Sequence, residues 1–221
     1  MIDLNNFDWG TTSQSYKEQM MSEIFSDKKS LYEYMFDVEE GDVVVDIGAT
    51  IGEFTFSILN KKPRHCYVVE PFGIFFDTLK KNLEGHPVSF INAAISSEKV
   101  LEIDWDGQQE NFRPLTFKEF IEQNRLKKID FLKVDCEGGE YDVFSTKNIE
   151  YLKCVPKIVT EIHLRSKINK EKFRYFRDKI LPNFKKFTFK SIDNVDVTWD
   201  LHNEHFIEYY NEVMLYIDNR N

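Results

Sequence analysis

Cysteine, proline and glycine are scarce in this chain, and positive charge is in the minority. The three cysteines, Cys66, Cys136 and Cys154, are odd in number and lack metal-ligand spacing, so they predict reduced thiols rather than a disulfide framework. The 29 Lys and Arg are outnumbered by 38 Asp and Glu, which leaves a net charge of -9. Because phosphate backbones require a basic surface, we expect no nucleic-acid partner.

Long hydrophobic runs are also absent. No stretch of about 18 apolar residues is present to span a bilayer, and the start of the chain, MIDLNNFDWG, lacks the basic and apolar parts of a signal peptide. We therefore expect a cytoplasmic protein without a membrane span. Aromatic residues are abundant instead: 20 Phe and 10 Tyr among 221 residues predict a substantial core, and the length suits a single domain.

The segment VVVDIGATIGEF, at residues 43–54, has the pattern of a strand, a tight loop and the start of a helix. Its valines favour a short buried strand, and its glycines lead into a helix-like run. Such a junction points backbone N–H groups at a ligand above the carboxyl end of the strand. Glu70 ends the next predicted strand, 24 residues after Asp46, where an acid can hydrogen-bond ribose hydroxyls. Together these features predict a nucleoside site.

Two acids beside the glycines indicate the charge of that ligand. The dinucleotide pattern is G-x-G-x-x-G, whereas this loop has Gly48 and Gly52, with Asp46 before them and Glu53 after. A pyrophosphate would face both carboxylates, and a helix N-terminus contributes only about 0.3–1 kcal/mol in its favour. A cation suits the same charges, and S-adenosylmethionine carries an ammonium and a sulfonium. The pattern D-x-G-x-x-x-G, followed by an acid at the end of the next strand, resembles the class I S-adenosylmethionine-dependent methyltransferases.

Segments downstream narrow the resemblance. IDFLKVDCEGGEYDVF, at residues 129–144, is similar to the signature of the FkbM family of methyltransferases, and NAAIS, at residues 92–96, resembles that family's adenine segment. VDIGATIGEF, VVEPF and EIH also occur in the expected order, and the resemblance covers about residues 38–164. It implies an α/β fold of the Rossmann-like class I type, with a mainly parallel seven-stranded sheet, an antiparallel C-terminal edge and helices on both faces.

The alternation of strand and helix patterns agrees with such a sheet. Expected strands are residues 43–47, 66–69, 88–93, 131–134 and 157–162, with 100–104, 184–191 and 212–217 as further candidates. Expected helices are 52–60, 74–83, 114–124, one from about 142, and 170–180, whereas 107–112 is interpreted as a polar turn. We assign residues 38–221 to the methyltransferase domain. Residues 1–37 form an arm with one or two amphipathic helices, as either a lid over the ligand or the face of a homodimer.

The resemblance assigns roles in binding S-adenosylmethionine. It implies that Asp46 orients the loop and the amino-acid part of the ligand, that the two glycines let the backbone approach, and that Glu70 binds the ribose diol. Pro71 and Phe72 would flank the adenine. The full set of expected cofactor residues is Asp46, Gly48, Ala49, Gly52, Glu53, Glu70, Pro71, Phe72, Asn92, Ala93, Ala94 and Asp135.

Transfer to a hydroxyl also requires removal of a proton, by a general base or with the help of a metal. Parallel strands gather their carboxyl ends at one edge, and acids are expected there at Asp46, Glu70, Asp135 and Glu161. One mechanism uses Glu137 or His163 as the base, with Asp135 also in the catalytic set. The other places Mg²⁺ on Asp135 and Glu161, with Glu137 or His163 as a further ligand. A third reading makes His163 a structural histidine.

The reaction expected from the resemblance is O-methylation of a hydroxyl on a sugar, a glycan or another small molecule. An N-methyltransferase or a protein methyltransferase is the enzymatic alternative. The alternative from another class is a non-catalytic module that binds S-adenosylmethionine or a partner on the same fold.

Overall fold

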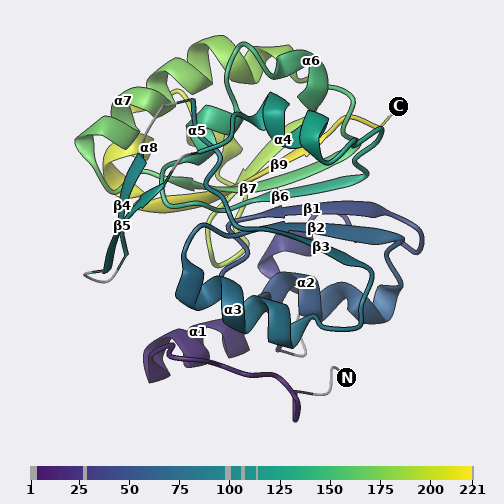
Figure 1. Cartoon of the computed structure of the whole chain (residues 1–221). Helices are drawn as coiled ribbons and strands as arrows, with labels where there is room; N and C mark the ends of the chain where they lie inside the picture. Colours follow the sequence, from purple (N-terminus) through teal and green to yellow (C-terminus); the bar gives the residue numbers. More distant parts are fainter. Residues whose placement is uncertain (1–3, 27–28, 98–100, 106–107, 113, 221) are drawn as a thin grey trace.

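A seven-stranded sheet forms the centre of the computed structural model, which describes residues 4–26, 29–97, 101–105, 108–112 and 114–220 (Figure 1). The strand order is β3-β2-β1-β6-β7-β9-β8. The strands are β1 (Val43–Ile47), β2 (His65–Val69), β3 (Val88–Ile91), β6 (Phe131–Val134), β7 (Lys157–His163), β8 (Phe187–Lys190) and β9 (Glu212–Asp218). The first five in this order run parallel, and β9 lies antiparallel between β7 and β8. The predicted fold class is therefore confirmed.

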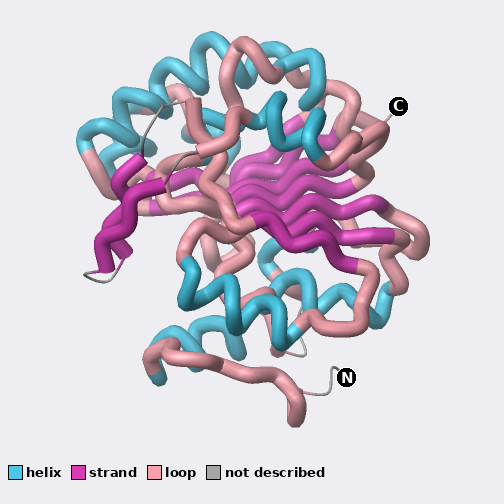
Figure 2. The backbone as a smooth tube through the Cα atoms, in the orientation of Figure 1, coloured by secondary structure: helices cyan, strands magenta, loops and turns pink. Residues whose placement is uncertain are grey.

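Helices cover both faces of this sheet (Figure 2). On one side lie α1 (Gln14–Glu23), α2 (Glu53–Ile58) and α3 (Gly73–Asn82), and on the other lie α4 (Phe117–Gln123), α5 (Glu140–Val143), α6 (Ile149–Leu152) and α7 (Lys167–Tyr175). A π-helix (Phe176–Ile180) continues α7, and α8 (Glu204–Tyr209) precedes β9. Thr116 caps α4 in the capping box that the sequence predicts, with Glu119 as its partner. Within the described part of the chain, no helix is long and apolar enough to cross a membrane.

The core is divided by the sheet, as the strand period of two requires. Val45 packs into the cluster that contains Phe120 of α4 and Phe173 of α7, whereas its neighbour Val44 packs into the cluster that contains Phe54 of α2. The central strands β1 and β6 are buried on both faces, so their sequences are mostly apolar rather than alternating. Parallel pairing brings the carboxyl ends of β1, β2, β6 and β7 to one edge of the sheet.

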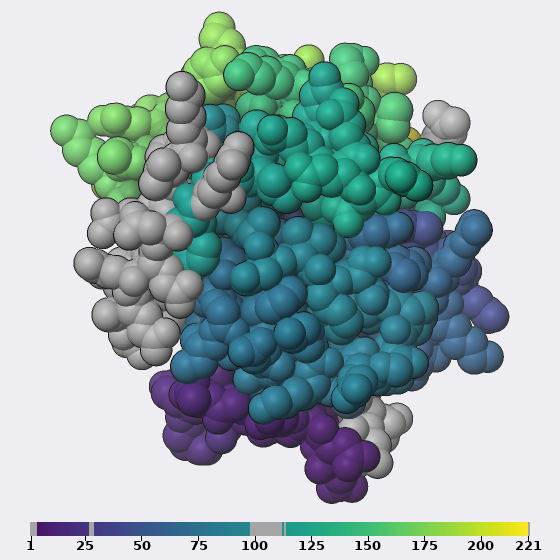
Figure 3. Space-filling view, viewed as in Figure 1, coloured from purple at the N-terminus to yellow at the C-terminus, as the bar shows by residue number. Residues whose placement is uncertain are grey.

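The N-terminal segment packs on the face of the sheet that carries α2. Met20 and Ile24 share a cluster with Val44, and hydrogen bonds to other parts of the chain hold the 3₁₀ turn Leu31–Glu33. The Val38 amide donates to the Glu33 carboxylate at 2.7 Å, and the Tyr216 hydroxyl donates to the Leu31 carbonyl. Figure 3 shows the N-terminal surface directly against the surface of the chain that follows. The segment is thus attached at both its helix and its turn.

Three parts of the expected element pattern are corrected by the structure. The prediction of a polar turn over residues 107–112 is wrong. Instead, β5 (Gln108–Phe112) pairs antiparallel with β4 (Leu101–Trp105) in a separate hairpin. Residues 100 and 107 of the expected segments lie outside the described residues. The strand expected at 88–93 ends at Ile91, which places Asn92 and Ala93 in the following loop. Helix α8 was not predicted, because its six residues carry no extended apolar period.

Candidate functional site

A cavity of about 290 Å³ opens at the carboxyl ends of the parallel strands. Because β1 lies between β2 and β6, the cavity has two ends. On the β2 and β3 side its walls are mainly apolar and include Phe72, Phe75, Ala93, Ala94 and Ile95, with Glu70 among them. On the β6 and β7 side they carry Asp135, Glu137, Glu161 and Arg165. The strand order therefore places a mainly apolar, nucleoside-like slot at one end of the cavity and the acidic side chains at the other end.

Glu70 is held at the end of β2 by backbone groups. Its Oε1 accepts from the Phe72 amide and its Oε2 from the Thr50 amide, both at 2.9 Å. Thr50 adopts φ +47, a left-handed conformation that is uncommon for a residue other than glycine. The Glu70 side chain is buried, and this burial raises the pKa of its carboxyl to about 8. Asn92 also holds the backbone after β2, since its Nδ2 donates to the carbonyls of Glu70 and Pro71 at 2.9 and 2.7 Å.

The two glycines of the loop after β1 are required by contacts within the chain. Gly48 has φ +78, and a Cβ at this position would lie 1.6 Å from the Asp135 carbonyl oxygen. Gly52 has φ +96, and a Cβ there would lie 2.8 Å from Leu79 Cδ1 of α3. The loop therefore lies directly against β6 on one side and α3 on the other. The role of these glycines toward a ligand stays a prediction.

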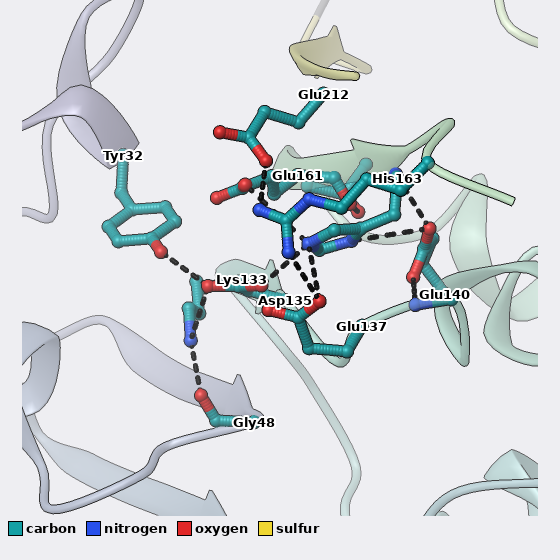
Figure 4. Close-up of polar contacts among 12 residues, drawn as sticks. Tyr32, Gly48, Lys133, Asp135, Glu137, Glu140, Glu161, His163 and Glu212 are labelled. Atoms are coloured by element: carbon teal, nitrogen blue, oxygen red, sulfur yellow. Dashed lines mark hydrogen bonds and ion pairs between the residues drawn. The ribbon is translucent and has the colours of Figure 1, made fainter. Parts of the chain in front are cut away.

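Lys133 links this loop to β6, and sequence reasoning missed it. Its Nζ lies 3.1 Å from Asp46 Oδ1 and donates to the Gly48 carbonyl at 2.6 Å (Figure 4). Asp46 is fully buried, and its other oxygen accepts from the Thr55 hydroxyl at 2.8 Å. Asp46 thus orients the loop through Lys133 and Thr55. The signal was present in FLKVD, where a lysine interrupts a strand that is otherwise apolar.

His163 lies behind the acidic end of the cavity, enclosed by four carboxylates (Figure 4). Its Nε2 is 3.4 Å from Glu137, 3.6 Å from Glu161 and 4.0 Å from Asp135, and its Nδ1 is 3.5 Å from Glu140. Burial lowers the pKa of the imidazole, but Glu137, Glu140 and Asp135 outweigh it and raise that pKa to about 11. These carboxylates therefore favour the protonated form of the ring. A protonated ring has no lone pair with which to accept a proton or bind a metal. The roles expected for His163, as a base, a metal ligand or a structural residue, stay predictions.

The remaining acids at this end differ in their partners. Asp135 Oδ2 accepts from the Tyr32 hydroxyl at 2.6 Å, and Glu137 accepts from Arg165 at 3.1 Å. Glu161 lines the cavity, and burial followed by repulsion from Asp135 raises its pKa well above the usual range, although His163 lowers it. Single ligand atoms of Asp135, Glu161 and His163 lie within 4.8 Å of one another, as a metal site would require. In its protonated form, His163 places one positive charge among these carboxylates.

The structure brings most of the predicted site residues to one cavity. The wall contains Gly48, Ala49, Glu53, Glu70, Pro71, Phe72, Ala93, Ala94, Asp135, Glu137 and Glu161. Asp46 and His163 are buried behind the wall. The lining residues that sequence reasoning missed include Tyr16, Glu23, Tyr32, Lys133 and Arg165. Their approach depends on long-range packing, and three of them come from the N-terminal segment.

A mainly parallel sheet with β9 inserted antiparallel between β7 and β8, and with an acid at the end of β2, has the architecture of the Rossmann-like class I methyltransferase fold. The family model described as "Methyltransferase FkbM domain" matches residues 46–191, about two thirds of the chain. The chain belongs to this family of methyltransferases.

Two curated relatives are methyltransferases by name. Hexuronic acid methyltransferase AglP of Haloferax volcanii is 24% identical over 143 residues, with 58% of each chain covered. Alpha N-terminal protein methyltransferase 1 of Schizosaccharomyces pombe is 41% identical over 58 residues, with 26% of each chain covered. The chain therefore spans little more than half of the first relative and about a quarter of the second.

Solved structures share the fold at low sequence identity. An rRNA methylase of Streptococcus thermophilus has a TM-score of 0.51 and 8% identity, covering 92% of this chain and 93% of that one. Fibrillarin in its complex with Nop5p has a TM-score of 0.50 and 13% identity, covering 97% and 89%. These likenesses show the fold alone.

Buried carboxyls predict an unusual pH dependence of stability. Burial raises the folded-state pKa of Glu53 to about 7 and that of Glu70 to about 8, so the folded protein binds more protons than the unfolded chain above pH 4.5. We therefore expect the free energy of unfolding of the ligand-free protein to fall, on the order of a few kcal/mol, between about pH 5 and pH 8. Urea unfolding at three pH values in this window measures the slope. Glu70→Gln should flatten it, and an equal slope in that variant would contradict the assignment.

Proposed function

We propose that the protein transfers the methyl group of S-adenosylmethionine to a hydroxyl oxygen of a small acceptor, with a sugar hydroxyl as the first choice. The observation that carries the proposal is one cavity that joins a nucleoside-like slot at Glu70 to an acidic end at β6 and β7. The name of the relative AglP, a hexuronic acid methyltransferase, supports a carbohydrate acceptor.

The residues present fit the cofactor. S-adenosylmethionine supplies, when bound, an electrophilic methyl group on a positively charged sulfur. Glu70 has its carboxylate fixed by two backbone amides and retains acceptor capacity for the ribose hydroxyls. Pro71, Phe72, Ala93 and Ala94 form the apolar walls for the adenine. Among the described lining residues, six carboxyl groups stand against Lys133 and Arg165, and a cationic ligand favours the ionised forms of these carboxyls.

The amino-acid part of the cofactor is assigned to the loop after β1. Gly48, Ala49 and Glu53 line the cavity between its two ends, and Glu53 supplies a carboxylate for the ammonium group. Asp46, Gly52 and Asn92 act behind this wall by fixing the loop and the corner after β2.

Glu161 is the group that we assign to accept the acceptor's proton. It lines the acidic end, and burial together with repulsion from Asp135 raises its pKa above the usual range, which makes its carboxylate a stronger base. Asp135, held by Tyr32, orients the hydroxyl. Glu137 is occupied by Arg165 and His163, and the protonated His163 stabilises Glu161 in its charged form. We propose this imidazolium as the cation of the cluster in place of the predicted Mg²⁺.

N-methylation is the second candidate, because an acidic wall also suits an acceptor that carries an amine. The acceptor panel should therefore include methyl glucoside, glucuronic acid and glucosamine. Transfer to a glucoside hydroxyl, unchanged by EDTA, is the expected result. Label on the amine of glucosamine would favour N-methylation, stimulation by Mg²⁺ would restore the metal mechanism, and binding without any transfer would favour a non-catalytic module.

Calorimetry tests the cofactor assignment. We expect Glu70→Ala to weaken the binding of S-adenosylmethionine by about 1–3 kcal/mol, since a buried hydrogen bond to the ribose is lost. Glu161→Gln should retain binding and lose turnover at least about a hundredfold. Glu150→Gln is the matched control, because this glutamate is 86% exposed on α6 and should change neither quantity. Full turnover in Glu161→Gln would contradict the assigned role of Glu161.

A further inference from the structure

Helix α1 lies outside the family match of residues 46–191, yet it forms part of the cavity wall. Its lining residues are Tyr16, Gln19, Met20 and Glu23, followed by Ile24 at its end. Met20 and Ile24 are buried in the same core as β1, so the contact is part of the fold. The family domain by itself therefore leaves one wall of the cavity open.

Polar contacts join α1 to the segment that follows β1, and the one with Glu53 is short. The Tyr16 hydroxyl donates to Glu53 Oε1 at 2.7 Å, and Glu53 is buried in the first turn of α2. Lys133 is a nearby cation, but its ammonium is already bonded to the Gly48 carbonyl and paired with Asp46. Tyr16 thus supplies the neutral donor that orients the Glu53 carboxylate, and an ionised carboxylate accepts several further hydrogen bonds.

We propose that Tyr16 is a positioning residue for the cofactor, which holds the Glu53 carboxylate toward the ammonium group of S-adenosylmethionine. The inference rests on the proposed placement of the cofactor and extends it to a residue outside the FkbM domain. Helix α1 then completes the part of the site that binds the amino-acid part of the ligand. The nucleoside half, which depends on Glu70 and the slot beside it, does not depend on Tyr16.

This division gives a test that needs no acceptor. Calorimetry with S-adenosylmethionine should show at least about fivefold weaker binding in Tyr16→Phe, since one hydrogen bond to a charged group is lost. The probe 5′-methylthioadenosine has the nucleoside and the sulfur but no amino-acid part. Its affinity should stay within about twofold of wild type in the same variant.

A matched control separates positioning from general packing. Tyr216→Phe also removes a buried tyrosine hydroxyl that anchors the N-terminal segment, through the Leu31 carbonyl, but it does not touch a cavity carboxylate. We expect this variant to bind both S-adenosylmethionine and 5′-methylthioadenosine with affinities within about twofold of wild type. In a Glu53→Gln background, Tyr16→Phe should cause no further loss of affinity for S-adenosylmethionine, because the two residues act through one contact.

Three outcomes would overturn the proposal: unchanged binding of S-adenosylmethionine in Tyr16→Phe, equal weakening of both probes, or equal weakening by Tyr216→Phe. The second would mean that α1 only shelters the cavity. Failure of every acceptor in the transfer assay, with the expected binding pattern intact, would remove the acceptor assignment and leave the role of Tyr16 standing.

Discussion

Gly48→Ala should prevent the chain from reaching its native fold. A Cβ at Gly48 would lie 1.6 Å from the carbonyl oxygen of Asp135 and 2.7 Å from its carbonyl carbon. Both are backbone atoms, so no side-chain rotation relieves the overlap, and the loop would have to leave β6. We expect a loss of more than about 4 kcal/mol, a large part of the stability of a typical domain. Yield of soluble protein and urea unfolding measure the effect.

Gly41→Ala is the control for this variant. Gly41 has φ +87, close to the φ +78 of Gly48, but a Cβ there meets nothing within 4 Å. It should therefore show only the conformational penalty of a left-handed alanine, about 1–2 kcal/mol. If the two variants lose the same stability, the contact between Gly48 and Asp135 is not what constrains the loop.

The strand ends were predictable because local composition sets them. Valines before Asp46 and the run before Glu70 favour short buried strands, and parallel strands bring their carboxyl ends together. Position along the chain therefore placed Glu70, Asp135 and Glu161 at one edge before any contact was known. The same reasoning placed the glycines in the loop, but it could not show that Gly48 lies against β6.

The parts that escaped prediction depend on contacts between distant residues. Tyr16 and Tyr32 reach Glu53 and Asp135 across 37 and 103 positions, and no local pattern encodes such pairs. The hairpin strand Gln108–Phe112 is polar, so its pairing with β4 leaves no hydrophobic alternation to detect. The sequence also contained no sign that the buried carboxylate of Glu140 would lie 3.5 Å from Nδ1 of His163.

Lys133→Met should destabilise the protein by about 3–5 kcal/mol, because it leaves the fully buried carboxylate of Asp46 without its cation. The Gly48 carbonyl would also lose its hydrogen-bond donor. This loss should make the loop after β1 more mobile and weaken the binding of S-adenosylmethionine. Urea unfolding and calorimetry report the two effects. The double variant Lys133→Met with Asp46→Asn should recover much of the stability, since a neutral amide requires no counter-charge.

Lys157→Met provides the comparison that isolates burial of the partner. Lys157 is as buried as Lys133 and lies at the start of β7, away from the cavity, where its ammonium is 2.7 Å from Asp42. The Asp42 side chain is 12% exposed, whereas that of Asp46 is 0% exposed, so water can solvate Asp42 once the lysine is gone. We therefore expect a smaller loss of stability and unchanged binding of S-adenosylmethionine. Equal losses in the two variants, with no recovery by Asp46→Asn, would mean that the lysine stems, rather than the buried charge on Asp46, account for the effect.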